Sequence, residues 1–442
     1  MSVFSLSGCG VGYLLQAGHG QWQLLRARVP IDRLIANDET DAALKSRLEL
    51  ARAAREFASR ELGLPDNRSY RSYSALGRSY VVWNVVAAPE FSVAPKRWWF
   101  PITGSIAYRG YFREANARRF AATLATRGYD TYVGGVSAYS TLGKFADPLL
   151  DTMLRYGDLQ LVGTMFHELA HQLVYVKSDS EFNEAFAMSV EREGVARWLA
   201  AAGRSAELAA YRESAQQQAQ LQRLLASGRA QLAALYGAAL PAAEMRQRKQ
   251  ALLAAIATSV RDYERQQGLR SGYEAWLDAG LNNAHLASVA TYFDCVPGFE
   301  RLLAQHGGEL HAYYQAVRAL ARGPAAGRRA LCDQGLLTGP GRARPEATPA
   351  AAPSVHLDID ASRFNHRHLR NHDFEHTIGM AGLDLLGAGI FRQRKAPQEF
   401  ALEALEPLVT FLVLALPEAT GAADCQHALV GRDLNILGID SR

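Results

Sequence analysis

The sequence has few cysteines, little net charge and no long hydrophobic run. Its four cysteines, Cys9, Cys295, Cys332 and Cys425, lie far apart among 442 residues and form no CxxC pair. We therefore expect neither a disulfide framework nor a cysteine-based zinc site. The net charge of +4 is small for this length and the arginines are scattered, which argues against a nucleic-acid partner. The longest apolar run, residues 408–417, is shorter than the eighteen or so residues of a membrane-spanning helix.

Cys9 is the one cysteine with a recognisable context. Residues 6–10, LSGCG, resemble the lipobox of bacterial lipoproteins, in which small residues precede a lipidated cysteine. Only eight residues precede Cys9, whereas a secretion signal has a basic region and an apolar region before its cleavage site. Two interpretations stay open. If the true start lies upstream, we expect a lipid anchor at Cys9 and a place in the bacterial cell envelope; if the match is accidental, a cytoplasmic protein.

Hydrophobic periodicity predicts a mixed α and β first half and a helical second half. Apolar residues at three- and four-residue steps predict helices at 39–62, 113–127 and 158–176. Segments rich in Val, Ile and aromatics predict strands at 79–91, 98–112 and 129–140, and the glycines of the last suggest a backbone that another chain can approach. Further on we expect a helical hairpin over 205–266 and helices at 285–294 and 297–322.

The remaining segments differ in composition. Pro, Gly and Ala dominate residues 323–354, which predicts a linker, and residues 355–442 form an unassigned C-terminal extension. This extension contains His366, His368, His372 and His376, for which a solvated basic tail is favoured over a metal site. We therefore divide the chain into an N-terminal segment, 1–22, one domain, 23–322, the linker and the extension.

The helix predicted at 158–176 contains the motif HExxH, as His167-Glu168-Leu169-Ala170-His171. Histidines four residues apart lie on one face of a helix, one turn apart, so both can reach one Zn²⁺. Glu168 lies one step round the helix, where it can address water rather than the metal. The alternative is a helix with a solvated His and Glu face, and a third ligand would decide between the two.

HExxH followed by an Asn-Glu-Ala stretch on a second helix resembles the gluzincin metallopeptidases, which include thermolysin. The matching residues here are His167, Glu168, His171, Asn183 and Glu184. The resemblance implies Zn²⁺ held by His167, His171 and Glu184, with Asn183 beside them. Twelve residues separate His171 from Glu184, fewer than in the best-known gluzincins, which implies a tighter turn between the two helices.

The chain is more closely similar to a family of bacterial predicted aminopeptidases over residues 9 to about 322. The segments that carry this resemblance include YRGYF, AYSTLGKFADPLL, GTMFHELAHQ, FNEAFAMSVEREGVARWL and LASVATYFDCVPGFERLL. The implied fold is α+β and zincin-like, with a small mixed β-sheet, an HExxH active-site helix and a largely helical C-terminal half.

Two further residues take roles by analogy with aminopeptidase-type gluzincins. Glu191, two turns after Glu184, can accept the outer N–H of a ligand histidine, and its alternative is a surface position. Tyr292 in SVATYFD can donate to the developing oxyanion, and its alternative is a core position.

Together these residues predict a zinc-dependent metallopeptidase that takes a peptide substrate, and the family resemblance implies an aminopeptidase rather than an endopeptidase. A zinc-bound water activated by Glu168 would hydrolyse the peptide bond. The alternative is a zinc-stabilised, non-catalytic envelope scaffold that binds a partner through the hairpin 205–266.

Overall fold

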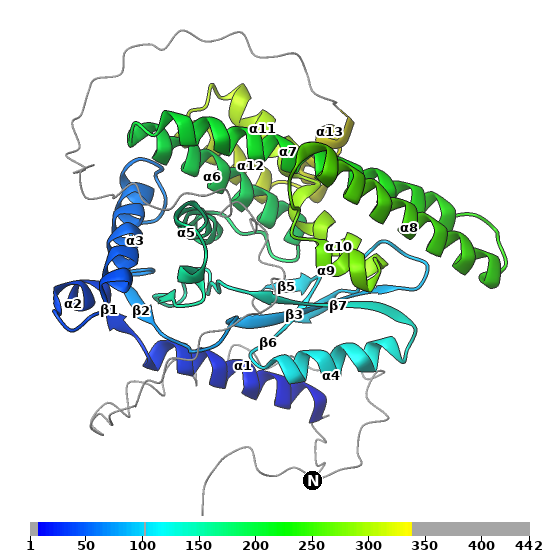
Figure 1. The fold of residues 1–442 in the computed structure, drawn as a ribbon, viewed down its shortest axis with the longest axis horizontal. Coiled ribbons are helices and arrows are strands. Elements are labelled where there is room, and N and C mark those ends of the chain that lie inside the picture. The colour runs from blue at the N-terminus through cyan, green and yellow to red at the C-terminus, as the bar shows by residue number, and fades with distance from the viewer. Residues whose placement is uncertain (1–7, 101–102, 338–442) are drawn as a thin grey trace, which may run out of the picture.

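The computed structural model describes residues 8–100 and 103–337 (Figure 1). These residues form an α+β fold in which helices surround three small sheets, so the predicted broad class is confirmed. The extension 355–442 with its histidines, Cys425, the run 408–417 and most of the predicted linker lie outside the described residues. No helix within the described ranges is both long and apolar enough to cross a membrane.

The first half of the described chain alternates helices and short strands. Its helices are α1 (Gly8–Arg26), α2 (Ile31–Ala36), α3 (Ala42–Arg60), α4 (Glu114–Ala125) and α5 (Asp158–Leu173), with a 3-10 turn at Met153–Arg155. Its strands are β1 (Val29–Pro30), β2 (Ser72–Ser74), β3 (Val82–Pro89), β4 (Trp98–Phe100), β5 (Gly104–Ile106), β6 (Arg109–Tyr111), β7 (Tyr129–Val136) and β8 (Leu149–Leu150).

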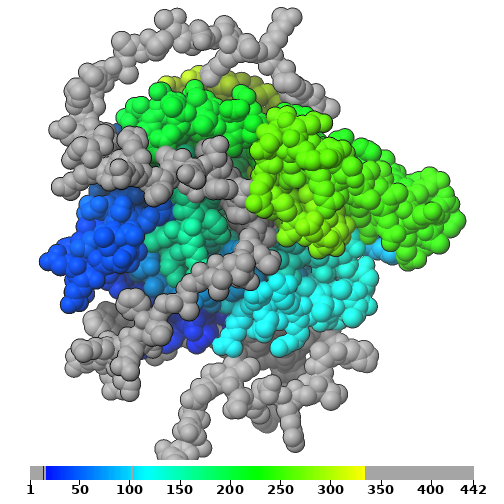
Figure 2. Space-filling view, viewed as in Figure 1, coloured from blue at the N-terminus to red at the C-terminus, as the bar shows by residue number. Residues whose placement is uncertain are grey.

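The second half is helical as far as it is described. Its helices are α6 (Ser180–Ala201), α7 (Ser205–Tyr236), α8 (Ala242–Gln267), α9 (Glu274–Ala279), α10 (Asn283–Phe293), α11 (Val296–Gln305), α12 (Leu310–Arg322) and α13 (Ala325–Leu337). Helices α7 and α8 pair as the predicted hairpin, which extends beyond the rest of the described chain (Figures 1 and 2). Gly228 allows this pairing, since a Cβ there would lie 2.5 Å from Ile256 Cγ1.

The antiparallel sheet β6-β3-β7 has two different faces because side chains alternate along a strand. Trp83, Val85 and Ala87 of β3 pack with α4 in a small separate cluster. Val82 and Val86 point to the opposite side and join the main core. Helices α4 and α10 consequently lie on opposite faces of this sheet (Figure 1).

Helix α5 lies in the main core between α3 and α6 (Figure 1). Its apolar residues Phe166 and Leu169 are fully buried, and Phe57 of α3 stacks on Phe166. Gly194 of α6 lets the two helices approach closely, since a Cβ there would lie 2.6 Å from Phe166 Cδ2. This contact fixes the spacing and rotation of α5 relative to α6.

Two predicted elements are broken in the structure. The strand predicted at 98–112 divides into β4, β5 and β6, with Gly104 at a φ of 76°. The helix predicted at 297–322 divides into α11 and α12 because Gly307 and Gly308 take φ values of 65° and 82°. The single small mixed sheet is likewise replaced by three sheets, of which β1-β2-β8 alone combines parallel and antiparallel pairs in the described part.

The predicted ends of the domain also require correction. Helix α1 runs unbroken across residues 22 and 23, where we expected a boundary. The linker prediction is wrong over residues 325–337, because these form α13, which packs on α11. Gly298 makes room for this packing, since a Cβ there would meet the Leu331 carbonyl oxygen at 2.3 Å.

One disulfide joins Cys295 to Cys332, contrary to the expectation from cysteine spacing. The two cysteines are 37 residues apart in sequence, and no local motif relates them. Packing of α13 against α11 brings their Cα atoms to 4.2 Å. The pairing therefore depends on a contact between helices that sequence spacing does not reveal.

Candidate metal centre

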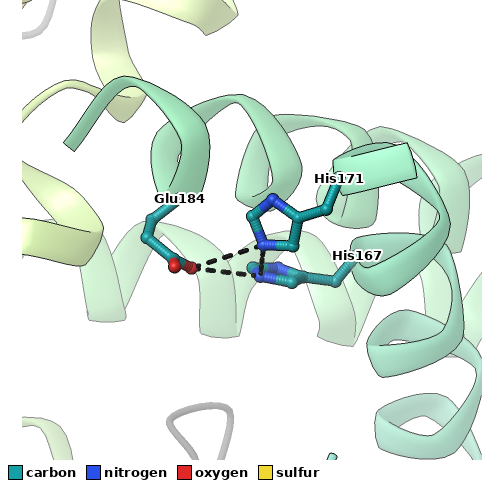
Figure 3. A group of neighbouring side chains, drawn as sticks. All are labelled: His167, His171 and Glu184. Atoms are coloured by element: carbon teal, nitrogen blue, oxygen red, sulfur yellow. Dashed lines mark hydrogen bonds and ion pairs between the residues drawn. The ribbon is translucent and has the colours of Figure 1, made fainter. Parts of the chain in front are cut away.

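Helices α5 and α6 bring His167, His171 and Glu184 together. His167 Nε2 lies 3.2 Å from His171 Nε2 and 3.4 Å from Glu184 Oε2. His171 Nε2 lies 3.6 Å from the same carboxylate oxygen. Figure 3 shows both imidazoles and the carboxylate pointing toward one shared space. One ligand atom from each residue lies within 4.8 Å of the other two, so the three can hold one metal ion.

The chemistry of this donor set fits a metal ion. Two imidazole nitrogens and a carboxylate oxygen are ligands that zinc takes in catalytic sites with an open fourth position. All three side chains are almost fully buried, with at most 11% of each exposed. Such a buried group of electron-pair donors requires a cation or a proton among them. The solvated helix face that was the alternative for His167 and His171 is therefore excluded.

Glu191 orients His167 from the side away from Glu184. Its Oε2 lies 3.0 Å from His167 Nδ1, so the Nδ1–H donates to the carboxylate and the Nε2 lone pair faces the shared space. Gly163 of α5 leaves room for this side chain, since a Cβ there would lie 3.1 Å from Glu191 Oε1. Glu191 is therefore buried beside a histidine, not at the surface.

Asn183 lines the same cavity as the three donors, and its carboxamide binds the backbone between α5 and α6. Its Oδ1 accepts from the Val176 backbone N at 2.7 Å, and its Nδ2 donates to the Val176 carbonyl at 2.8 Å. The side chain thus closes the turn between α5 and α6, and Asp179 caps α6 by accepting from Phe182 N. These bonds explain how twelve residues suffice between His171 and Glu184.

The pKa values of Glu184 and Glu168 are shifted in opposite directions. Burial alone would raise the pKa of Glu184, but the imidazoles of His171 and His167 outweigh it and hold that pKa at about 2. Glu168 responds in the opposite direction. Burial raises its pKa, and the two histidines offset only part of that effect. A carboxyl with a raised pKa is suited to exchanging protons near neutral pH.

A cavity of about 380 Å³ opens over the three donors. It is large enough for a short peptide segment and falls in the range of ligand-binding cavities. Glu168 and Tyr292 line it, and burial and then the carboxylates of Glu184 and Glu168 raise the pKa of the Tyr292 phenol. Tyr292 thus lies where a substrate would bind, and its catalytic role stays a prediction.

The sequence analysis singled out only Tyr292 among the tyrosines of the cavity, and two of those it missed lie close enough to Glu184 to be affected by its charge. Tyr108 and Tyr175 line the cavity beside Tyr292, and burial followed by the Glu184 charge raises the pKa of each. Tyr108 lies in the segment YRGYF, but no spacing relates it to the HExxH motif. Tyr108 lies in the short connection between β5 and β6, and this connection runs along the cavity.

The buried carboxyl group of Asp147 stabilises a segment that lines the cavity. Asp147 accepts from Thr141 N at 2.9 Å and from Thr141 Oγ1 at 2.7 Å. These bonds close the segment 137–147, of which Thr141, Leu142 and Phe145 line the cavity. Burial raises the pKa of Asp147 to about 6 despite the two bonds from Thr141.

The site is thus a buried His, His and Glu cluster that could hold a metal ion, next to a cavity large enough for a ligand. The sequence model of the family described as "Putative aminopeptidase" matches residues 12–332, and the chain belongs to this family. The resemblance to a family of predicted aminopeptidases is thereby confirmed. No curated protein and no solved structure matches the chain.

Proposed function

We propose that this protein is a zinc-dependent metallopeptidase, and an aminopeptidase rather than an endopeptidase. The observation that carries the proposal is the convergence of His167, His171 and Glu184 on one buried space at the base of the cavity. The family description supports peptide hydrolysis as the reaction. Orientation of His167 by Glu191 supports a site built for a metal ion, because ligand histidines regularly donate their outer N–H to a carboxylate.

Each residue has a defined part in the reaction. His167, His171 and Glu184 would hold the zinc. Zinc bound there would supply Lewis-acid chemistry, which acidifies water and polarises a carbonyl group. Glu168 takes a proton from the attacking water and delivers it to the leaving amine. The hydroxyl of Tyr292 donates a hydrogen bond to the carbonyl oxygen as negative charge develops on it.

The disulfide supports the proposed localisation in the cell envelope. Structural disulfides form and persist in oxidising compartments, whereas mesophilic cytosol keeps thiols reduced. Cys295 is buried, and its bridge to Cys332 joins α13 to the start of α11. Thiol trapping of the protein in whole cells tests this part of the proposal. A fully reduced pair in the native host contradicts an envelope location.

The function itself is tested by metal analysis and a peptide-library digest. Protein purified without chelators is expected to contain about one zinc per chain. Glu168→Gln should keep that zinc and lose at least about a hundredfold in hydrolysis rate. Glu193→Gln, a charge-neutralising change at a salt bridge with Arg197, is the matched control.

Mass spectrometry of the digest separates trimming at the amino terminus from internal cleavage. Trimming supports the aminopeptidase, whereas internal cleavage alone supports an endopeptidase at the same centre. A zinc-loaded protein that cleaves no peptide contradicts the proposal and favours the non-catalytic scaffold. Absence of zinc from the wild type contradicts both.

A further inference from the structure

One wall of the cavity is formed by β3, the central strand of the sheet β6-β3-β7. Val82, Asn84 and Val86 of β3 alternate onto the same face, and all three line the cavity. Asn84 is the polar member between two valines. Asparagine is disfavoured in strands, and its carboxamide gains nothing from packing against apolar neighbours. Packing therefore does not explain an asparagine between Val82 and Val86, whereas a hydrogen-bonding ligand in the cavity does.

Glycines flank Asn84 on both neighbouring strands. The register pairs Asn84 with Gly110 of β6 on one side and with Gly134 of β7 on the other. Both glycines also line the cavity, so the Asn84 carboxamide is the only side chain in its row of the three strands. A Cβ on Gly110 would lie 3.2 Å from Asn84 Oδ1, closer than a methyl group comfortably approaches an amide oxygen.

The carboxamide is accessible from the cavity. Asn84 is partly exposed, although most of its neighbours in β3 are buried. Within the described ranges, no hydrogen bond joins the Asn84 side chain to another residue of the protein. Its donor and acceptor groups are therefore available to a ligand that enters the cavity.

We propose that Asn84 is a substrate-binding residue whose carboxamide pairs with a main-chain peptide group of the bound peptide. A carboxamide offers one acceptor oxygen and an amide donor, and a peptide group offers the complementary pair. Because both residues paired with Asn84 across the sheet are glycines, no side chain from those two positions competes with a peptide group for the carboxamide, although the Tyr132 ring covers Gly134. The inference rests on the proposed function and specifies how the substrate is positioned before Glu168 acts.

This pairing also explains why the polar group lies in an apolar wall. A ligand that cannot form hydrogen bonds here leaves the desolvated carboxamide without partners. The resulting loss of binding free energy is larger than the loss caused by one missing methyl group. Asn84 thus selects for a peptide main chain, while Val82 and Val86 contact apolar parts of the substrate without specifying them.

The test compares kcat/KM for a peptide that the wild type cleaves in the library digest. The variants are Asn84→Ala and Asn84→Leu, and the control is Asn116→Ala on α4, which packs on the opposite face of the sheet. Both Asn84 variants should lose about 10- to 100-fold in kcat/KM, with unchanged zinc content and melting temperature. Asn116→Ala should match the wild type.

A set of substrates methylated singly at each non-scissile peptide nitrogen provides a readout that a structural role would not change. In the wild type, one methylated position should cost about tenfold in kcat/KM. In Asn84→Ala, the penalty at that position should fall to less than about threefold, while penalties elsewhere persist.

Rates of both Asn84 variants within threefold of the wild type would overturn the inference and leave the proposed peptidase intact. So would a set of methylation penalties that is the same in wild type and variant. A zinc-loaded wild type that cleaves nothing overturns the proposed function, and this inference with it. If Asn84→Ala is unstable, the nearly isosteric Asn84→Leu supplies the same comparison.

Discussion

Glu191 Oε2 and His167 Nδ1 lie 3.0 Å apart and join the helix that carries HExxH to the helix that carries the third donor. The bond fixes the imidazole by its outer nitrogen, which leaves the inner nitrogen facing His171 and Glu184. Because Gly163 makes the space for it, the contact depends on one residue from each helix and on one position without a side chain.

Glu191→Gln should weaken zinc binding by about 10- to 100-fold, because the neutral amide is a poorer acceptor for the His167 N–H. Competition with a chelator of known affinity measures the change. Glu193→Gln, two residues further along α6, should keep the wild-type affinity. Equal affinities for Glu191→Gln and the wild type would show that this carboxylate does not tune the site.

Tyr292→Phe should lower kcat by about 10²- to 10³-fold and change KM little, since the hydroxyl would act on charge that develops only in the transition state. Tyr108→Phe and Tyr175→Phe remove hydroxyls from the same cavity and serve as matched comparisons. Steady-state kinetics on one peptide decides among them. A large kcat loss in Tyr108→Phe, with Tyr292→Phe active, would transfer the role to Tyr108.

Asn183→Ala should destabilise the turn between α5 and α6 by about 2–4 kcal/mol, because it leaves both backbone groups of Val176 without their partner. Urea unfolding of the zinc-free protein measures the difference, with Asn116→Ala as control. Zinc affinity should fall as a consequence, since the turn positions Glu184. Loss of zinc with unchanged stability would instead support the role beside the zinc ligands that the sequence suggested.

His285 should make the protein less stable in acid. Burial against Trp276 and Tyr132 lowers its pKa from 6.5 to about 4. Between these values the unfolded chain binds a proton that the folded chain does not, so stability falls as the pH drops from about 6.5 to 4 and is regained as it rises.

The matched variant is His285→Gln, which can keep the capping box at the start of α10 but does not titrate. The difference in unfolding free energy between wild type and variant should change by up to about 3 kcal/mol between pH 7 and pH 4. Contributions from zinc and from Asp147 are common to both proteins and cancel in this difference. A constant difference across that pH range would contradict the assignment to His285.

Replacing Cys295 and Cys332 together by Ala should lower the free energy of unfolding by about 2–4 kcal/mol, because the bridge closes a loop of 37 residues in the unfolded chain. Denaturant unfolding with and without a thiol reductant measures it. The reductant should destabilise the wild type and leave the double variant unchanged. A wild type that is insensitive to reductant when unfolded would show that the bridge is not formed.

Several features of the chain followed from local sequence patterns. The spacing within HELAH places His167 and His171 on one helical face, and helical periodicity located α3, α4, α5 and the α7–α8 hairpin to within a few residues. Alternation and β-branched residues located β3 and β7 in the same way. These are properties of residues close in sequence, and their geometry is set by 3.6-residue and 2-residue periods.

Contacts between distant segments were predicted poorly, for a physical reason. The disulfide, the docking of α13 on α11 and the breaks between β4, β5 and β6 depend on partners that no local period specifies. Asn183 shows the same limit, since no local pattern revealed that its carboxamide binds both backbone groups of Val176.

The sequence by itself determined that two imidazoles share one helical face with an acid beside them, and that a second acid-bearing helix follows. Only the tertiary structure decided that Glu184 and Glu191 approach from opposite sides of His167, because this needs the rotation of α6 fixed by Gly163 and Gly194. It also placed Asn84 between two glycines on the cavity wall, since register between strands is set by packing across the whole sheet.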